Sequence, residues 1–192
     1  MRRLELIAKK HYAALPYHNF EHALWVRRQA RKYMRRCKKY KIPYKGDVIE
    51  TAALFHDAGY DKVKNSKEAY SCKIARRELK KLKYLPGFIQ QVEQTIMATK
   101  AGYPLKTTEQ KIIRAADLSS FTANYRDFLV GSKKIVKEYK ILYHGKQFPV
   151  KKWAKLIRVY LRQRVQLTPQ YSRDNFDVKA ERNIARFLRE YQ

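Results

Sequence analysis

The stretch Ala53-Leu54-Phe55-His56-Asp57 places a histidine and an aspartate side by side at the end of an apolar run. Neither side chain is easily buried without a partner, and imidazole and carboxylate are both common ligands of divalent ions that prefer nitrogen and oxygen. Two adjacent ligands do not complete a coordination sphere, so other parts of the chain must supply the rest. His22 and Asp117 are the two candidates.

Helical spacing predicts that the two histidines point inward. His22 lies four residues before Val26, on the apolar side of a helix expected to reach about residue 40. His56 lies seven residues after Ile49, on the last turn of the next helix, where Gly59 provides the stop. Taken singly, each could be a core histidine held by one hydrogen bond, and His56 could be a residue favoured by the helix dipole.

Asp117 completes the apolar stripe of a later helix, and a bare carboxylate is very costly to bury. It could pair with a neighbouring arginine, just as Asp57 could serve only to cap a turn. One metal ion would account for all of these residues together. We therefore expect His22, His56, Asp57 and Asp117 to converge.

The flanks of these residues resemble a known family. Residues 17–26 read Tyr-His-Asn-x-x-His-x-x-x-Val, residues 54–60 read Leu-Phe-His-Asp-x-Gly-Tyr, and an Ala-Asp-Leu follows at 116–118. This order resembles the HD superfamily of metal-dependent phosphohydrolases over about residues 4–140. The small single-domain members are the most similar, because Asp61 and the Glu-x-x-Ser at 68–71 match their pattern.

The resemblance implies an all-α fold, a compact HD-domain bundle of roughly eight to nine helices. We expect residues 1–192 to form a single domain, with a ligand-bearing core at about 4–140 and the C-terminal helices of 141–192 packed on it. Apolar periodicity predicts helices at about 2–14, 20–40, 47–56, 66–83, 88–100, 108–117, 128–143, 150–167 and 175–191. Asn19 and Asp47 are the expected caps of the second and third helices.

The resemblance also implies the cofactor, which is one divalent metal ion held by His22, His56, Asp57 and Asp117. Members of the superfamily with a second metal carry extra histidines, and none occurs between residues 57 and 143. Mn, Fe, Co, Ni, Mg and Zn all accept such ligands, so the sequence leaves the identity of the ion open.

Three residues have catalytic roles by the same resemblance. His18 would serve the leaving group, although it could also be a residue that only bonds backbone at the start of its helix. Asp57 or Asp61 would take the proton of the attacking water. Tyr60 stands where related nucleotidases often carry glutamate, which separates this chain from them.

The candidate substrate-binding residues are Lys62, Lys100 and Arg114, which flank the expected site, and Glu68. Each of the three cations could equally belong to a solvated face in so basic a chain. For Glu68, a favourable charge at the start of a helix is a sufficient alternative.

The chain carries 44 lysines and arginines against 17 acidic residues, for a net charge of +27. Such a field attracts nucleotides, nucleic acid or an acidic partner, unless it only keeps the surface solvated. We expect an enzyme that hydrolyses a phosphate ester or anhydride, with a nucleotide or another phosphorylated small molecule as substrate. The alternative is a nucleic-acid-binding protein or an oligonucleotide phosphodiesterase on an HD scaffold.

One expected helix, at 150–167, places Trp153 and Leu156 on its apolar face and basic residues outward. Our hypothesis is that its Lys155, Arg158 and Arg162 lie on the same side of the molecule as the metal. There they would draw in anionic substrates.

The remaining features indicate the compartment. The first ten residues lack an apolar core, so no signal peptide is expected, and no apolar run is long enough for a membrane span. Cys37 and Cys72 are predicted to be reduced core thiols. We therefore expect a cytoplasmic protein without a membrane partner, and leave its oligomeric state open.

Overall fold

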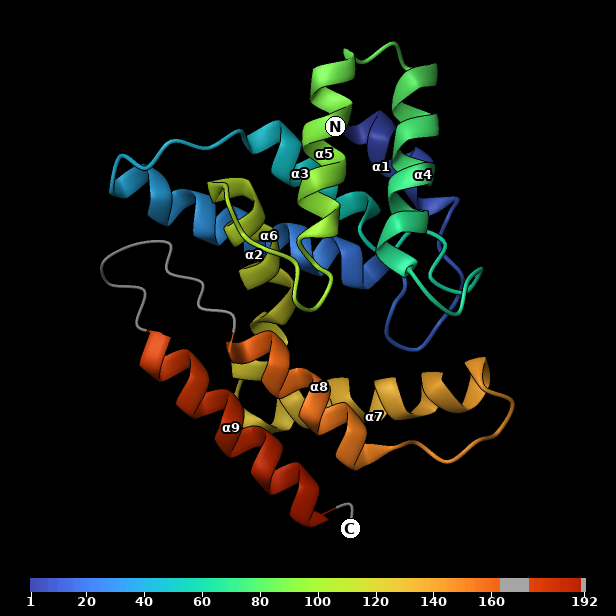
Figure 1. Ribbon diagram of the computed structural model, residues 1–192, viewed down its shortest axis with the longest axis vertical. Helices are drawn as coiled ribbons and strands as arrows, with labels where there is room; N and C mark the ends of the chain where they lie inside the picture. Colours follow the sequence, from blue (N-terminus) through green and yellow to red (C-terminus); the bar gives the residue numbers. More distant parts are fainter. Residues whose placement is uncertain (163–172, 191–192) are drawn as a thin grey trace.

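A computed structural model describes residues 1–162 and 173–190, and these residues form nine α-helices and one 3-10 helix, with no strand among them (Figure 1). The predicted all-α class is confirmed. The helices are α1 (Arg2–Lys9), α2 (Phe20–Lys39), α3 (Gly46–Phe55), α4 (Lys67–Lys81), α5 (Pro86–Met97), α6 (Thr108–Asp117), η1 (Leu118–Thr122), α7 (Tyr125–Leu142), α8 (Val150–Arg162) and α9 (Arg173–Glu190). None of the described helices is long and apolar enough to cross a membrane.

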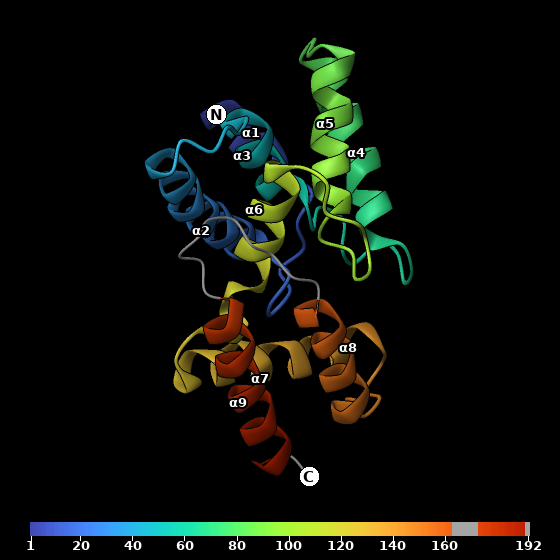
Figure 2. The same ribbon diagram turned by 60° about the vertical axis from the view of Figure 1, so that its left-hand side comes forward.

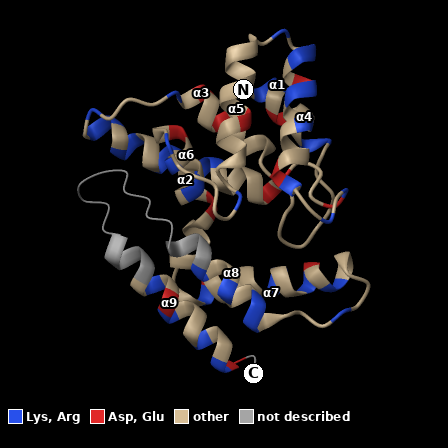
Figure 3. Ribbon diagram, viewed as in Figure 1, with Lys and Arg blue, Asp and Glu red and all other residues tan. Residues whose placement is uncertain are grey.

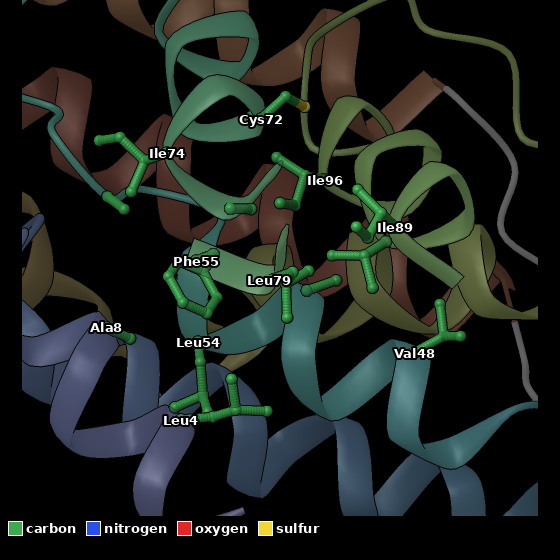
Figure 4. Packing of buried hydrophobic residues seen from close by; sticks show 14 residues of the cluster. Leu4, Ala8, Val48, Leu54, Phe55, Cys72, Ile74, Leu79, Ile89 and Ile96 are labelled. Carbon is green, nitrogen blue, oxygen red and sulfur yellow. The ribbon is translucent and has the colours of Figure 1, made fainter. Parts of the chain in front are cut away.

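Helix α3 lies at the centre of the N-terminal helices and packs against α2, α5 and α6. Its residues from Thr51 to Phe55 are all buried, as expected of an apolar run without a solvent face. Around Leu54 and Phe55, side chains from α1, α4 and α5 form one apolar cluster (Figure 4). The motif that ends α3 is therefore held by packing on several sides.

The turn after α3 depends on Gly59, which has a φ of +73°. A Cβ at this position would lie 2.6 Å from Cε1 of Tyr70 and 2.7 Å from Cδ1 of Ile74. The Gly59 amide also donates a hydrogen bond of 2.8 Å to the carbonyl of His11. Helix α3 itself ends at Phe55, so Gly59 does not terminate the helix as predicted but shapes the turn that follows it, where only glycine combines this conformation with so close an approach.

Two helix starts are fixed by side-chain caps. The Asn19 side chain accepts a hydrogen bond from the amide of His22, as predicted, and Thr107 forms a capping box with Gln110. The prediction for Asp47 was wrong. Helix α3 begins one residue earlier, and the Asp47 carboxylate accepts only from the adjacent amide of Val48. Helix α1 ends at Lys9, five residues before its predicted end.

The C-terminal helices α7, α8 and α9 form a layer below the N-terminal helices in both views (Figures 1 and 2). They share a core with η1, to which Phe128, Trp153 and Phe187 contribute large aromatic side chains. Leu156 was predicted to point into this core, but it is 46% exposed because Trp153, Ala154 and Ile157 occupy the buried face of α8. The side chain of Arg162 lies outside the described residues.

Both cysteines, Cys37 and Cys72, are buried free thiols, as expected. Burial raises the pKa of each thiol, to about 12 for Cys72, where the charge of Glu93 adds to the effect.

Candidate metal centre

Four side chains, from α2, from α6 and from the turn that follows α3, meet at one point. Oδ2 of Asp57 lies 2.9 Å from Nε2 of His56 and 3.6 Å from Nε2 of His22. Oδ1 of Asp117 lies 3.4 Å from Nε2 of His22 and 3.7 Å from Nε2 of His56. Two imidazole nitrogens and two carboxylate oxygens therefore face a common centre, as the sequence predicted.

The helices bring these groups together because the neighbours of each one are buried. His22 lies in the first turn of α2, whose inward residues include Ala23 and Val26. His56 is the C-cap of α3. Asp117 is the last residue of α6, directly after the buried Ala116. Helices α2, α3 and α6 all pack on one another, so the ends that carry the four groups are fixed.

The donor atoms fit a cation. Nε2 of His22, Nε2 of His56 and Oδ2 of Asp57 are buried, and among the described residues no group outside the cluster satisfies any of them. A buried polar atom without a partner costs about 1–3 kcal/mol, so three at one point indicate a ligand. Donors about 2.1 Å from an ion lie about 3 Å from one another, close to the spacing found here. His22, His56 and Asp117 have the geometry of a metal-binding group.

The other ring nitrogen of His56 fixes the orientation of that ligand. Nδ1 lies 3.0 Å from the carbonyl oxygen of Ala53, to which it donates. This hydrogen bond leaves the lone pair of Nε2 directed at the common centre, an arrangement that is typical of metal-bound histidine.

The charges of the four groups are strongly coupled. Burial opposes charge on Asp57, yet the neighbouring His56, His18 and His22 hold the pKa of its carboxyl below the usual range. Burial also lowers the pKa of His56, but Asp57 and Asp117 outweigh it and raise this pKa to about 9. The cluster therefore favours a positive charge at its centre, whether a proton or a metal ion provides it.

His18 lies beside the four groups and is held in place by hydrogen bonds to Glu138 of α7. One Glu138 oxygen accepts from Nδ1 of His18, and the other accepts from the backbone amides of His18 at 2.8 Å and Tyr17 at 3.0 Å. The Tyr60 ring stacks on the imidazole, with 3.8 Å between centroids. The ring centroid of His18 is 5.9 Å from that of His22, so this residue adjoins the four converging groups.

Glu138 is 2% exposed, and the sequence interpretation missed it. Burial alone would raise the pKa of its carboxyl. The hydrogen bonds and the charge of His18 have the larger effect, so the pKa lies below its usual value. The available signal was its position three residues after Ile135 and six after Ser132, on the inward face of α7. A glutamate on such a face requires a partner.

Lys67 is the second residue that the sequence interpretation missed. Its Nζ lies 3.2 Å from the centroid of the Tyr60 ring, on which His18 also stacks. Burial lowers the pKa of Lys67, while the carboxylates of Glu138 and Asp57 raise it.

Asp61 and Lys62 are placed differently from the expectation. They form an ion pair of 2.8 Å, and the side chain of Lys62 is 63% exposed. Asp61 lines a separate cavity of about 180 Å³ with His11 and Tyr12. Its Oδ1 is buried without a hydrogen-bond partner among the described residues. Lys62 therefore neutralises Asp61 and is not directed at the four converging groups.

The prediction for Arg114 was wrong. Its side chain is fully buried and donates from Nε to the carbonyl of Ala98 at 2.5 Å and from a terminal nitrogen to the carbonyl of Lys100. The guanidinium thus satisfies the backbone at the end of α5, and it offers no exposed surface to a substrate. The Lys100 side chain is exposed, and Glu68 is half-buried in the first turn of α4.

The sequence model of a family described as HD domain matches residues 19–121, which is more than half of the 192 residues. The match contains all four converging groups and ends before Glu138. No curated protein and no solved structure matches the chain significantly.

Proposed function

We propose, from the premise that this chain belongs to the HD domain family, that it is a metal-dependent phosphohydrolase that cleaves a phosphate ester or anhydride of a nucleotide. The family is one of metal-dependent phosphohydrolases. His22, His56, Asp57 and Asp117 would hold one divalent ion.

One observation carries the proposal. Each of the two carboxylate oxygens lies 2.9–3.7 Å from both imidazole nitrogens, and three of these four ligand atoms are buried with no hydrogen-bond partner outside the cluster among the described residues. A cluster with only a structural role would be expected to satisfy its own polar atoms.

A divalent ion at this point, when bound, activates water and offsets the negative charge that develops on a phosphoryl group. Asp57, ionised by its histidine neighbours, is the proposed proton acceptor for the attacking water. Asp61, the other candidate for this role, is not assigned to it, because its carboxylate pairs with Lys62 and lines a separate cavity.

His18 is the proposed catalytic residue on the leaving-group side. Glu138 occupies its Nδ1, so Nε2 is the nitrogen that remains to contact the departing oxygen. Glu138 is a positioning residue in this scheme, because it acts through His18. Lys67, whose Nζ lies over the Tyr60 ring, takes over the substrate-binding role expected of Arg114 and would attract a phosphate oxygen there. Lys62, Lys100 and Glu68 stay as peripheral candidates for substrate contact.

The proposal is tested by metal analysis and hydrolysis together. We expect the purified protein, reloaded with Mn²⁺, to hold about one ion per chain and to hydrolyse p-nitrophenyl phosphate or bis(p-nitrophenyl) phosphate. Asp57→Asn should lose most of the metal and at least about a hundredfold in activity. The control is His144→Asn, because His144 is exposed and lies in a turn with a φ of 52° that asparagine tolerates. A wild-type protein that takes up metal without hydrolysing phosphate compounds would contradict the proposal.

A further inference from the structure

A cavity of about 600 Å³ adjoins His18 and separates the N-terminal helices from α7 and α8, and we call it the α7–α8 cavity. From the N-terminal side it is lined by His18, Tyr60 and Lys67. Its other walls come from α7, α8 and the loop between them: Ile135, Glu138, Tyr139, Leu142, Tyr143, Phe148, Pro149, Lys152, Trp153, Lys155 and Leu156. The residues of these other walls lie beyond the segment that matches the family, whereas Tyr60 and Lys67 lie within it.

The wall from α7 and α8 is apolar and well packed. Tyr139 stacks on Tyr143, with 4.3 Å between ring centroids, and meets Phe148 edge to face. Phe148 in turn packs against Trp153. Pockets of several hundred Å³ with aromatic walls bind groups of the size of a nucleoside or a two-ring system. A phosphate group alone would leave most of this volume empty.

The lining of the α7–α8 cavity carries more positive than negative side chains. Lys67, Lys152 and Lys155 supply three cations, and the latter two are exposed on α8. Glu138 is the one acidic residue among the lining residues, and both of its oxygens accept hydrogen bonds from residues 17 and 18. The lysines of α8 therefore have no carboxylate to face within the cavity, which favours an anionic ligand group at that end.

A second cavity, near the four converging groups, differs from the α7–α8 cavity in its aromatic lining and in its balance of charges. It measures about 450 Å³, is lined by His22 and Trp25, and carries Arg28 and Lys134 together with Glu21 and Asp127. Its cations are thus balanced by carboxylates, and fewer aromatic rings line it. The α7–α8 cavity is the better fit for the organic part of an anionic substrate.

We propose, on the basis of the proposed function, that the α7–α8 cavity binds the leaving group of the substrate and selects one with an aromatic ring system and a second anionic group. The scissile phosphate would lie at the four converging groups, the leaving oxygen at His18, and the ring between Tyr143 and Leu156. The second anion would reach Lys152 and Lys155. This places the substrate among nucleotides or aryl phosphates with negative charge beyond the phosphate that is cleaved.

The test measures binding of non-hydrolysable phosphonates to the Mn²⁺-loaded protein by titration calorimetry. The probes are methylphosphonate, 1-naphthylmethylphosphonate, and the same naphthyl compound with a sulfonate on its far ring. We expect the naphthyl ring to raise affinity at least about tenfold over methylphosphonate, and the sulfonate to add a further gain of about fivefold.

Two pairs of matched variants assign these gains to the cavity. Leu156→Asp should remove the gain from the ring, whereas Ile141→Asp, at a similarly exposed apolar residue of α7 outside the cavity, should keep it. Lys155→Gln should remove the gain from the sulfonate, whereas Lys151→Gln, on the same helix but outside the lining, should not. None of these four residues is one of the four converging groups, so an unchanged affinity for methylphosphonate and an unchanged Tm serve as the folding controls.

The outcomes separate the two proposals. If the ring gives no gain, or if Leu156→Asp and Ile141→Asp behave alike, the inference is overturned while hydrolysis of p-nitrophenyl phosphate keeps the proposed function. If the wild-type protein hydrolyses neither p-nitrophenyl phosphate nor 1-naphthyl phosphate, the proposed function fails and a leaving-group site fails with it. If the sulfonate gain survives Lys155→Gln, the second anion does not lie at α8, which also overturns the inference.

Discussion

Glu138 accepts three hydrogen bonds from residues 17 and 18, one of them from the imidazole of His18, and so joins α7 to the segment that precedes α2. Its carboxylate lies outside the segment that matches the family, whereas the four converging groups lie inside it. The C-terminal layer is therefore more than a support for the fold. It supplies the residue that orients the histidine next to the candidate metal centre.

Glu138→Gln should lower kcat about 10- to 100-fold with little change in metal content, because the neutral amide holds His18 less firmly and removes its charge partner. KM for p-nitrophenyl phosphate should change less than kcat, as expected for an interaction that matters in the transition state. Glu181→Gln, which removes an exposed carboxylate of α9, is the control. A loss of bound metal in Glu138→Gln that accounts for the lost activity would contradict a positioning role.

The same residue gives a prediction for stability. Burial raises the pKa of Glu138, but His18 and the two amides outweigh it and hold this pKa below 4.5. A folded-state pKa below the unfolded value means that the stabilisation is complete above about pH 4.5 and is lost as pH falls through the folded-state value. Glu138→Gln should be less stable than the wild type by about 1–3 kcal/mol near pH 6. In urea titrations this difference should shrink below about pH 4.5, and a constant difference down to about pH 3 would contradict the assignment.

The sequence was sufficient for the fold class and for the convergence of His22, His56, Asp57 and Asp117, because each lies within or next to an apolar helical stripe. A polar residue in such a stripe is a strong signal, since its burial must be compensated. Glu138 also lies on the inward face of its helix and so also requires a partner. No motif surrounds this residue, so the sequence did not single it out.

Other details depend on tertiary contacts that the periodicity of a sequence does not specify. Arg114 lies three residues before Asp117, so proximity in sequence suggested the site, whereas the side chain reaches the backbone at the end of α5. Leu156 completes an apolar pattern along α8, but Trp153 and Ile157 already fill the core beneath that helix. Periodicity in the sequence predicts only which face of its helix a side chain lies on. The packing between helices decides which neighbour that side chain contacts.

The candidate metal centre predicts stabilisation by added metal. A ligand at about a hundred times its Kd stabilises the folded state by about 2.7 kcal/mol, which corresponds to a rise in Tm of about 5–10 °C for a chain of this size. Thermal melts of chelator-treated protein with and without Mn²⁺ measure this rise. His22→Ala should abolish it, and His144→Asn should retain it. An equal rise in His22→Ala would show that the ion binds elsewhere.

The burial of Arg114 predicts a structural role in place of a role in substrate binding. Arg114→Met keeps the apolar stem but removes the donors to the carbonyls of Ala98 and Lys100, and should lower the free energy of unfolding by about 2–4 kcal/mol. Lys111→Met, on the same helix and partly exposed, should change it by no more than about 0.5 kcal/mol. Unchanged stability with a raised KM for p-nitrophenyl phosphate would restore the original assignment.

The net charge of +27 leaves nucleic acid as an alternative partner, and basic residues are found on helices of both layers (Figure 3). Among the residues proposed from the sequence, Arg158 pairs with Glu181 at 3.0 Å and the side chain of Arg162 lies outside the described residues, whereas Lys155 lines the α7–α8 cavity. If an oligonucleotide binds only through the α7–α8 cavity, Lys67, Lys152 and Lys155 offer three phosphate contacts. A plot of log K against log salt for single-stranded DNA should then have a slope no steeper than about −2, from about −0.7 per contact. Lys152→Gln and Lys155→Gln should each reduce the slope by about 0.7. A slope of about −4 or steeper that ignores both substitutions would instead assign the charge to an extended nucleic-acid surface, and the small-molecule substrate would have to be abandoned.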